Sequence, residues 1–190
     1  LKWVQLDLGK SMPIDQIRLF AAQEYGFDDF GFPHRFKVEI SDHPDFANPI
    51  TIADFQNEDH PRPGSTPISI DAKNSAGQYV RVTASKLWSR RRKGEPLSQD
   101  WIFALGEMSV LSKGEKVKVE KVTSFDSIEA LPRWGHANLI DGYPANLNNN
   151  LDSLVETRDR LLKEVAGNEL SEVQNSRGKV THFTEEISKL

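Results

Sequence analysis

Near its beginning the chain reads Trp3-Val4-Gln5-Leu6-Asp7-Leu8-Gly9. The apolar Val4, Leu6 and Leu8 alternate with the other side chains, and Gly9 ends the run. Successive side chains of a strand point to opposite faces, so this period of two predicts a β-strand with one buried face. Trp3 lies at the edge of this strand, and we expect its ring to pack into the core.

The same alternation recurs in short segments up to about residue 112, and turn residues separate the segments. Their apolar positions are Ile17, Leu19, Ala21, Phe36, Val38, Ile40, Ile50, Ile52, Ile68, Ile70, Val80, Val82, Ala84, Phe103, Leu105, Met108 and Val110. Many short strands with regular turns are typical of an antiparallel β-sandwich or barrel. We therefore predict a mainly β, antiparallel sandwich over residues 1–112, with Phe36 in its core.

The rest of the chain divides into two further segments. Residues 113–150 hold an expected strand between Val117 and Val122, followed by turn sequence rich in asparagine. Residues 151–190 place apolar side chains at helical spacing, and Gly167-Asn168 interrupts them. We predict a C-terminal helical hairpin or coiled-coil segment there.

The composition disfavours several classes of protein. The 190 residues carry a formal net charge of −4, whereas binding to nucleic acid or anionic membranes usually needs a basic surplus. Cysteine is absent, which excludes disulfides and thiol chemistry. No apolar run reaches the ~20 residues that cross a bilayer, and no signal peptide is visible. Because the chain begins at Leu1 in the middle of a pattern, we interpret it as a piece of a longer protein.

Catalytic signatures are also absent from the sequence. It contains no Gly-x-Ser-x-Gly motif, no glycine-rich phosphate loop and no metalloprotease helix motif. The acid pairs Asp28-Asp29 and Glu58-Asp59 lie in expected loops, whereas a glycosidase needs two carboxylates across a cleft. We predict that this chain is not an enzyme, and a catalytic domain elsewhere in the parent protein stays open.

Four stretches in series resemble the coagulation-factor type C domain, also called the discoidin domain. They are residues 3–9, 35–42, 79–84 and 103–110. The resemblance implies a galactose-binding-like, jelly-roll β-sandwich over residues 1–112. It also implies a binding role, because members of the family bind sugars, membranes or proteins and occur in exported multi-domain bacterial proteins.

The chain departs from the family at its opening. The family normally begins with a segment that contains Asn-Leu-Ile-Asp-Gly, and here this sequence appears late, at residues 138–142. Two explanations stay open. Residues 113–150 begin a second discoidin repeat that the helices interrupt, which we favour, or they complete the first sandwich in a permuted order.

Two long connections, residues 23–33 and 88–101, are rich in aromatic and charged residues. Long loops are often functional, and a sugar site combines an aromatic face with a few polar groups. The candidate ligand-binding residues are Tyr25, Phe27, Asp28, Phe30, His34, Trp88, Arg90 and Trp101.

Each candidate has a second interpretation. The phenylalanines could pin the first loop onto the sandwich, and the two tryptophans could cover one end of it. Residues 90–93 could form a solvated loop tip, and His34 could make a structural hydrogen bond.

The discoidin resemblance also implies a structural calcium ion at Asn138 and Asp141. Calcium takes about six to eight oxygen ligands, and Asn146, Asn148, Asn149 and Asn150 could supply more. A plain β-turn is the alternative interpretation.

The sequence thus predicts a non-catalytic binding module of a larger exported or cell-surface protein. A carbohydrate-binding role is favoured, with a glycan or cell-surface polysaccharide as partner. The alternative is a protein–protein interaction or spacer module that oligomerises through residues 151–190. We expect an extracellular, periplasmic or cell-surface location, with no nucleic-acid partner and no membrane span.

Overall fold

The computed structural model describes residues 1–91, 99–143 and 158. The chain forms two compact units, Leu1–Asn146 and Leu147–Leu190. Except for residue 158, the helical segment predicted at 151–190 falls outside the described residues. Among the described residues, no helix is long and apolar enough to cross a membrane.

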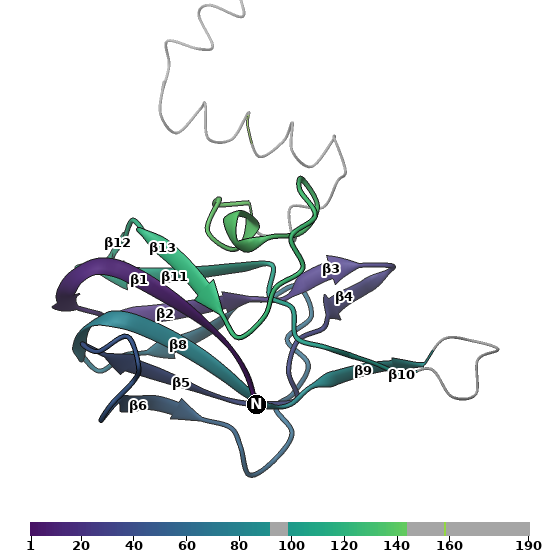
Figure 1. Cartoon of the computed structure of the whole chain (residues 1–190), viewed down its shortest axis with the longest axis horizontal. Helices are drawn as coiled ribbons and strands as arrows, with labels where there is room; N and C mark the ends of the chain where they lie inside the picture. Colours follow the sequence, from purple (N-terminus) through teal and green to yellow (C-terminus); the bar gives the residue numbers. More distant parts are fainter. Residues whose placement is uncertain (92–98, 144–157, 159–190) are drawn as a thin grey trace, which may run out of the picture. The chain divides into compact units, whose positions relative to one another are not determined.

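The described residues of the first unit form antiparallel strands and one short 3-10 helix (Figure 1). In chain order these are β1 (Lys2–Pro13), β2 (Gln16–Phe20), β3 (Ala22–Glu24), β4 (Phe27–Phe30), β5 (Arg35–Ser41), β6 (Ile50–Asp54), β7 (Ile68–Asp71), β8 (Ala76–Lys86), β9 (Trp88–Arg91), β10 (Gln99–Ile102), β11 (Glu107–Ser112), β12 (Glu115–Lys116), β13 (Lys121–Ser124) and η1 (His136–Leu139). A five-stranded sheet has the order β13-β1-β8-β5-β6, and a four-stranded sheet has the order β12-β11-β2-β7. The predicted mainly β fold with antiparallel sheets is confirmed.

The core lies between the two sheets and is built from the apolar positions of the alternating segments. Leu6 and Phe36 enter it from the five-stranded sheet, and Ile17 and Met108 enter it from the four-stranded sheet. All four are fully buried. Phe36 is therefore a core residue, as predicted.

Two details of the predicted strands are wrong. Trp3 is not part of the core, because it belongs to the face of β1 opposite the buried Val4 and Leu6. The last predicted strand begins only at Glu107, and Phe103 and Leu105 before it pack against the core outside any strand. Gly106 lies at this junction, where an added Cβ would stand 2.6 Å from the carbonyl oxygen of Ala21.

The two segments predicted as long loops contain paired strands instead. Residues 23–33 include most of the β3–β4 hairpin, and residues 88–101 include β9 and nearly all of β10, which pair with each other. Arg90 therefore belongs to a strand and not to a loop tip, since it pairs with Asp100. These ribbons lie outside the two main sheets.

Residues 113–143 pack onto the sandwich formed by the preceding residues. Strand β12 pairs with β11, and β13 pairs with β1 at the edge of the five-stranded sheet. Leu139 of η1 is buried in the same core. Residues 113–143 thus add one strand to each of the two main sheets.

A buried acid joins this late segment to β11. The Glu107 side chain is only 1% exposed, and it accepts hydrogen bonds from Lys116 Nζ at 2.7 Å and from the backbone N–H of Gly142 at 3.2 Å. Burial raises the pKa of Glu107 above its ordinary value of 4.5, although Lys116 partly offsets this. Glu107 on β11 is thus a buried acid, and the cation that pairs with it, Lys116, comes from β12.

Lys116→Met is expected to lower the free energy of unfolding by about 2 kcal/mol at pH 7, because it leaves the Glu107 carboxylate buried without its cation. A raised carboxyl pKa adds stability below the unfolded-state pKa and loses it as pH rises through the folded-state pKa. The loss should therefore be smaller at pH 4 than at pH 7, as measured by urea unfolding.

The double variant Glu107→Gln/Lys116→Met is the matched control, and it should recover most of the lost stability. An equal loss at both pH values would contradict a role for the buried charge.

Candidate functional site

Trp3, Gln5 and Asp7 point outward from the five-stranded sheet because they alternate with the buried apolar residues of β1. The pairing register decides which side chains stand beside them on this outer face. The rows in the order β13, β1 and β8 are Lys121-Asp7-Tyr79 and Thr123-Gln5-Arg81, followed by Trp3-Thr83 on β1 and β8. Two aromatic rings and several polar groups thus share one face of the sheet.

This outer face is hollowed. A concavity of about 390 Å³ is lined by Trp3, Gln5, Asp7, Pro44, Tyr79, Lys121 and Thr123. We call it the sheet-face concavity. Its volume falls within the roughly 300–1,000 Å³ of small-molecule sites. Most of its lining side chains are half-buried or exposed, so it is a depression open to solvent.

Arg81 holds the Trp3 ring from one side. Its guanidinium carbon lies 4.5 Å from the ring centroid of Trp3 and 3.8 Å from that of Phe46. The same guanidinium donates to Gln5 Oε1 at 2.6 Å and to the carbonyl oxygen of Pro44 at 3.1 Å. Burial lowers the pKa of Arg81. The stack fixes the Trp3 ring before any ligand arrives.

Phe46 reaches this stack at a cost in backbone conformation. Its φ is +60°, a left-handed value that a bulky residue rarely adopts, and its side chain is buried. In this conformation the Phe46 ring contacts the Arg81 guanidinium, and so the loop after β5 contributes to the stack that holds Trp3.

The polar end of the concavity is also organised in advance. Asp7 Oδ1 accepts the backbone N–H of Gly9 at 2.8 Å and Gln78 Nε2 at 2.9 Å. Gln78 Nε2 also lies 3.0 Å from the Tyr79 hydroxyl. Among the described residues, no hydrogen bond engages Asp7 Oδ2 or Lys121 Nζ. An acceptor and a donor therefore face solvent side by side.

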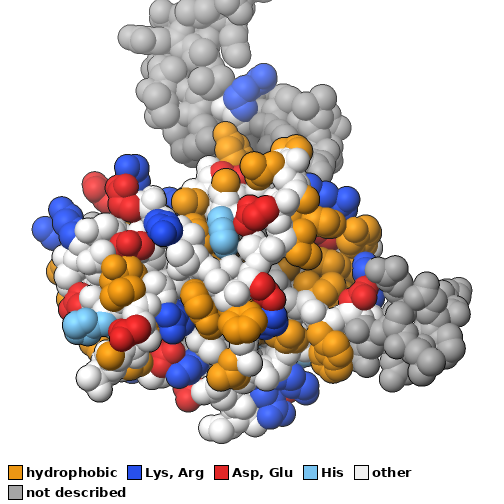
Figure 2. Space-filling model, in the orientation of Figure 1, with side chains coloured by type: hydrophobic (Ala, Val, Ile, Leu, Met, Phe, Trp, Pro, Cys, Tyr) orange, Lys and Arg blue, Asp and Glu red, His pale blue; other side chains and the backbone are white. Residues whose placement is uncertain are grey.

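The predicted loop residues gather elsewhere. Tyr25, Phe27, Phe30 and Trp88 form an aromatic cluster where the β3–β4 hairpin packs on β9, with ring centroids 5.2–5.6 Å apart. Figure 2 shows hydrophobic side chains gathered on this side of the molecule. Phe30 and Trp88 are buried, whereas Tyr25 is 56% and Phe27 is 37% exposed. The buried pair anchors the hairpin, which was the second interpretation of the loop phenylalanines.

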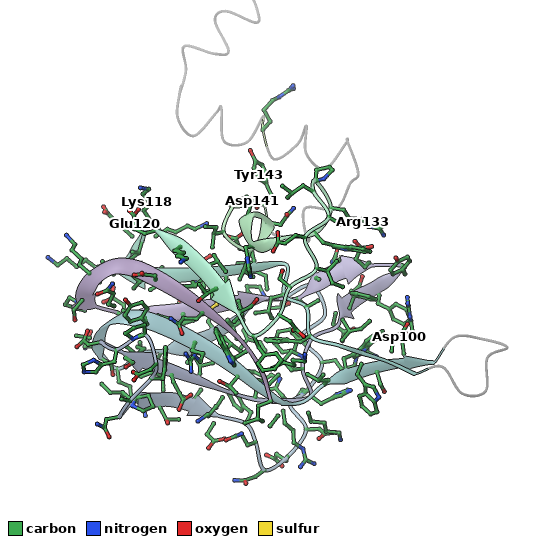
Figure 3. The ribbon with its side chains drawn as sticks, viewed as in Figure 1. Asp100, Lys118, Glu120, Arg133, Asp141 and Tyr143 are labelled. Carbon is green, nitrogen blue, oxygen red and sulfur yellow. The ribbon has the colours of Figure 1, made fainter. Side chains whose placement is uncertain are left out.

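Cations cover part of this cluster. The guanidinium carbons of Arg90 and Arg133 lie 4.9 and 5.1 Å from the Tyr25 centroid. Arg133 stands beside β3 (Figure 3), where it donates to both carboxylate oxygens of Glu24. This hydrogen bonding lowers the pKa of Glu24 and raises that of Arg133. The Tyr25 ring is thus already engaged by two protein cations.

Trp101 does not join the aromatic cluster. The register pairs Trp101 with Ser89 and Asp100 with Arg90, and neighbouring residues of a strand point to opposite faces. Arg90 and Asp100 form an ion pair at 3.0 Å, and Figure 3 shows Asp100 on the ribbon. Trp101 therefore lies on the other face of the ribbon and is 60% exposed.

The remaining two candidates have separate surroundings. Asp28 is exposed, and its buried neighbour Asp29 forms an ion pair with Arg62. The backbone N–H of His34 donates to the carbonyl oxygen of Lys86 at 2.9 Å. The His34 side chain lines a cavity of about 10 Å³, which has room for about one water molecule.

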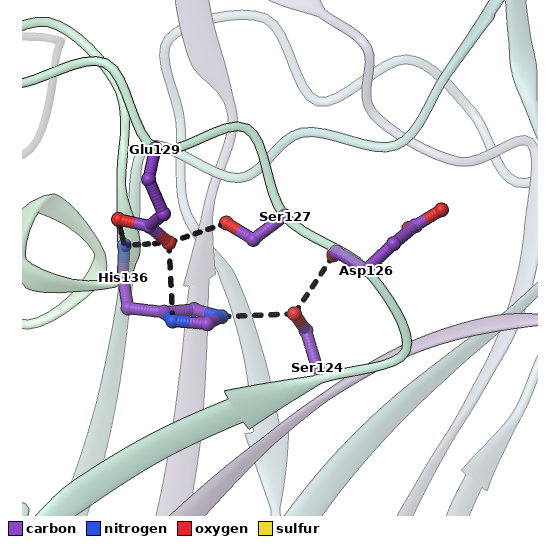
Figure 4. A network of polar contacts seen from close by, with 5 residues as sticks. All are labelled: Ser124, Asp126, Ser127, Glu129 and His136. Atoms are coloured by element: carbon purple, nitrogen blue, oxygen red, sulfur yellow. Dashed lines mark hydrogen bonds and ion pairs between the residues drawn. The ribbon is translucent and has the colours of Figure 1, made fainter.

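A histidine network fastens the turn after β13 (Figure 4). His136 Nε2 lies 2.8 Å from Ser124 Oγ, and its Nδ1 lies 3.1 Å from Glu129 Oε1. The Ser124 hydroxyl also donates to the carbonyl oxygen of Asp126 at 2.8 Å. None of these residues lines the sheet-face concavity. The network ties η1 to the end of β13.

The predicted calcium residues have few free oxygens. Asn138 Oδ1 is buried without a hydrogen-bond partner, and Asp141 Oδ1 accepts the backbone N–H of Tyr143 at 2.8 Å. Within the described residues, no three or more His, Cys, Asp or Glu side chains could hold a metal ion together. The side-chain oxygens of Asn138 and Asp141 are fewer than the oxygen ligands that calcium prefers. Asn146 to Asn150 lie outside the described residues.

The calcium hypothesis stays a prediction with a direct test. Calcium bound at this turn should raise the Tm on addition of CaCl2, and a chelator should reverse the rise. Asp141→Ala should abolish the effect, while Asp42→Ala, a surface acid elsewhere, should keep it. An unchanged Tm in the unmodified chain would contradict calcium binding.

Three residues that line the concavity were not among the predicted ligand-binding residues: Tyr79, Lys121 and Thr123. The sequence does mark Trp3, because it stands in line with the polar Gln5 and Asp7 and not with the apolar Val4 and Leu6. An aromatic side chain on the solvent face of a strand does not fill the core, so its ring is open to other contacts. Its neighbours on β8 and β13 could not be identified without the register.

Comparisons with known proteins gave one loose likeness. No family model matches the chain, and no curated protein matches it. A solved structure, chitosan-binding module 1 of a chitosanase/glucanase from Paenibacillus sp. IK-5, is 17% identical with a TM-score of 0.40. The match covers 58% of this chain and 67% of that one. A likeness of this size carries no inference about the ligand of this chain.

Proposed function

We propose that this chain is a non-catalytic carbohydrate-binding module of a larger exported or cell-surface protein, and that it binds glycan in the sheet-face concavity. The observation that carries the proposal is the half-exposed Trp3 ring, which Arg81 holds in place and which lines the same concavity as Asp7 and Lys121. The exported, multi-domain part of the proposal is supported by the discoidin-like stretches of the sequence.

The chemistry of the concavity suits a sugar. A pyranose presents C–H groups on one face, which pack on an aromatic ring, and hydroxyls at its edge. The Asp7 carboxylate can accept hydrogen bonds from hydroxyls, and Lys121 can donate to them. Because Trp3, Asp7 and Tyr79 are already held by neighbours, little side-chain freedom is lost on binding.

The non-catalytic part of the proposal rests on the acids of the concavity. Of the described residues that line it, Asp7 alone carries a carboxylate. Glycoside hydrolysis in most families needs a second carboxylate across the scissile bond. Asp7 is paired in register with Lys121 instead.

The aromatic cluster is a weaker candidate for the glycan surface. The Tyr25 ring is covered in part by two guanidinium groups, and Phe30 and Trp88 are buried. The protein–protein alternative rests on residues 151–190, nearly all of which lie outside the described part of the chain.

The experiment is a binding screen with the full chain. Insoluble cellulose, chitin and chitosan are used in pull-downs, and xyloglucan, mixed-linkage glucan and galactomannan in affinity electrophoresis. We expect depletion from solution, or retarded migration, with at least one polysaccharide. Full recovery in every pull-down together with unchanged migration in every gel would overturn the proposal.

A further inference from the structure

We propose that the sheet-face concavity binds an internal stretch of a polysaccharide chain that runs along β1 and β8, with one sugar on Trp3 and another on Tyr79. This inference rests on the proposed function and specifies its ligand. The two aromatic residues line the same concavity and lie at opposite ends of it along the strands.

The register sets the distance between the two rings. Trp3 is paired with Thr83, and Tyr79 is paired with Asp7, so the two aromatic residues stand four positions apart along the paired strands. At about 3.3 Å per residue this separation is ~13 Å. One pyranose ring cannot reach both side chains, whereas about three to four linked sugars can at this spacing.

The middle of the concavity fits a chain that passes through. Between the two aromatic rows lies the row of Thr123, Gln5 and Arg81. Gln5 is buried and accepts from Arg81, so the Gln5 side chain forms the floor between the two aromatic residues. The exposed Pro44 and Lys121 flank the depression. A linear chain can therefore lie along the strands without ending in a closed pocket.

The two ends make different contacts. Trp3 offers the face of a ring backed by Arg81, which supports stacking with little discrimination among sugars. Tyr79 shares its row with Asp7 and Lys121, so a sugar there meets a ring, a carboxylate and an ammonium group. We expect Trp3 to supply general affinity and the Tyr79 end to recognise hydroxyl configuration.

The test measures affinity against ligand length. Oligosaccharides of one to six units are taken from the series that matches the best polysaccharide of the screen, for example cello-oligosaccharides for cellulose or manno-oligosaccharides for galactomannan. Calorimetry with the full chain should show affinity rising up to about four units and then levelling. The monosaccharide should bind at least about tenfold more weakly than the longest fragment.

Tyr79→Ala separates the two ends. It should weaken binding of the longest fragment about tenfold and leave the weak binding of the disaccharide unchanged, because the disaccharide can sit on Trp3 alone. Tyr79→Phe keeps the ring and should retain most of the affinity, which also guards against a folding defect in the alanine variant.

Equal affinity for the monosaccharide and the longest fragment would overturn this inference while the proposed function stands. Equal loss of mono- and oligosaccharide binding in a folded Tyr79→Ala would also overturn it. Failure of the whole polysaccharide screen would instead remove the proposed function itself.

Discussion

Trp3→Ala is expected to weaken polysaccharide binding by about thirtyfold, as truncation of a central aromatic anchor commonly does. The variant removes the ring that Arg81 holds in the sheet-face concavity. The folded core should tolerate the change, because Trp3 lies outside the core cluster. The measurement is the migration of the full chain in gels with graded polysaccharide concentration, or calorimetry with the longest soluble fragment.

Trp101→Ala is the matched control. It removes an equally large ring that is 60% exposed, but from the β9–β10 ribbon and not from the concavity. We expect its affinity to equal that of the unmodified chain. The opposite pattern, with binding lost in Trp101→Ala and kept in Trp3→Ala, would place the glycan at the loop residues that the sequence analysis selected.

Phe36→Ala is expected to lower the free energy of unfolding by about 4 kcal/mol, since it deletes a large side chain from a packed interior. Phe36 has no exposed surface, and its ring centroid lies 5.5 Å from that of Phe32, 5.0 Å from Phe55 and 5.4 Å from His60. These neighbours come from different segments of the chain, so collapse around the cavity would require several of them to move.

Tryptophan fluorescence during urea unfolding is a suitable measurement. The four tryptophans all lie within residues 1–146, so the signal reports on this unit and not on residues 147–190. Phe125→Ala is the control, because Phe125 is 59% exposed and Lys2 Nζ lies 4.5 Å from its ring centroid. A loss below about 1 kcal/mol in Phe36→Ala would contradict its place in the core.

Much of the sandwich follows from local pattern. Val4, Leu6 and Leu8 are buried, as are Val80 and Val82, because a period of two assigns each strand an inner face. The sequence was less informative where a strand lacks the apolar alternation. The ribbon β9–β10 carries charged residues in the run expected to be a loop, and the register of Arg90 with Asp100 holds it as a pair of strands.

The predicted site was only partly informative. Aromatic residues of the long connections do gather, but Phe30 and Trp88 serve to anchor a hairpin, and Trp101 faces away from them. The exposure of these side chains and the residues that they contact depend on how the β3–β4 hairpin packs on β9. The amino-acid composition does not indicate that packing. The sequence analysis also assigned Trp3 to the core, although its phase in the alternation indicates the outer face.

The sequence by itself determined the alternating strands of the two main sheets and most of their inner faces, because these depend on side-chain order along a single segment. Only the tertiary structure decided that β12 pairs with β11 and that β13 pairs with β1. It thereby placed Lys121 and Tyr79 on either side of Asp7. The physical reason is that pairing joins strands distant in the chain through backbone hydrogen bonds, whose register no local pattern specifies.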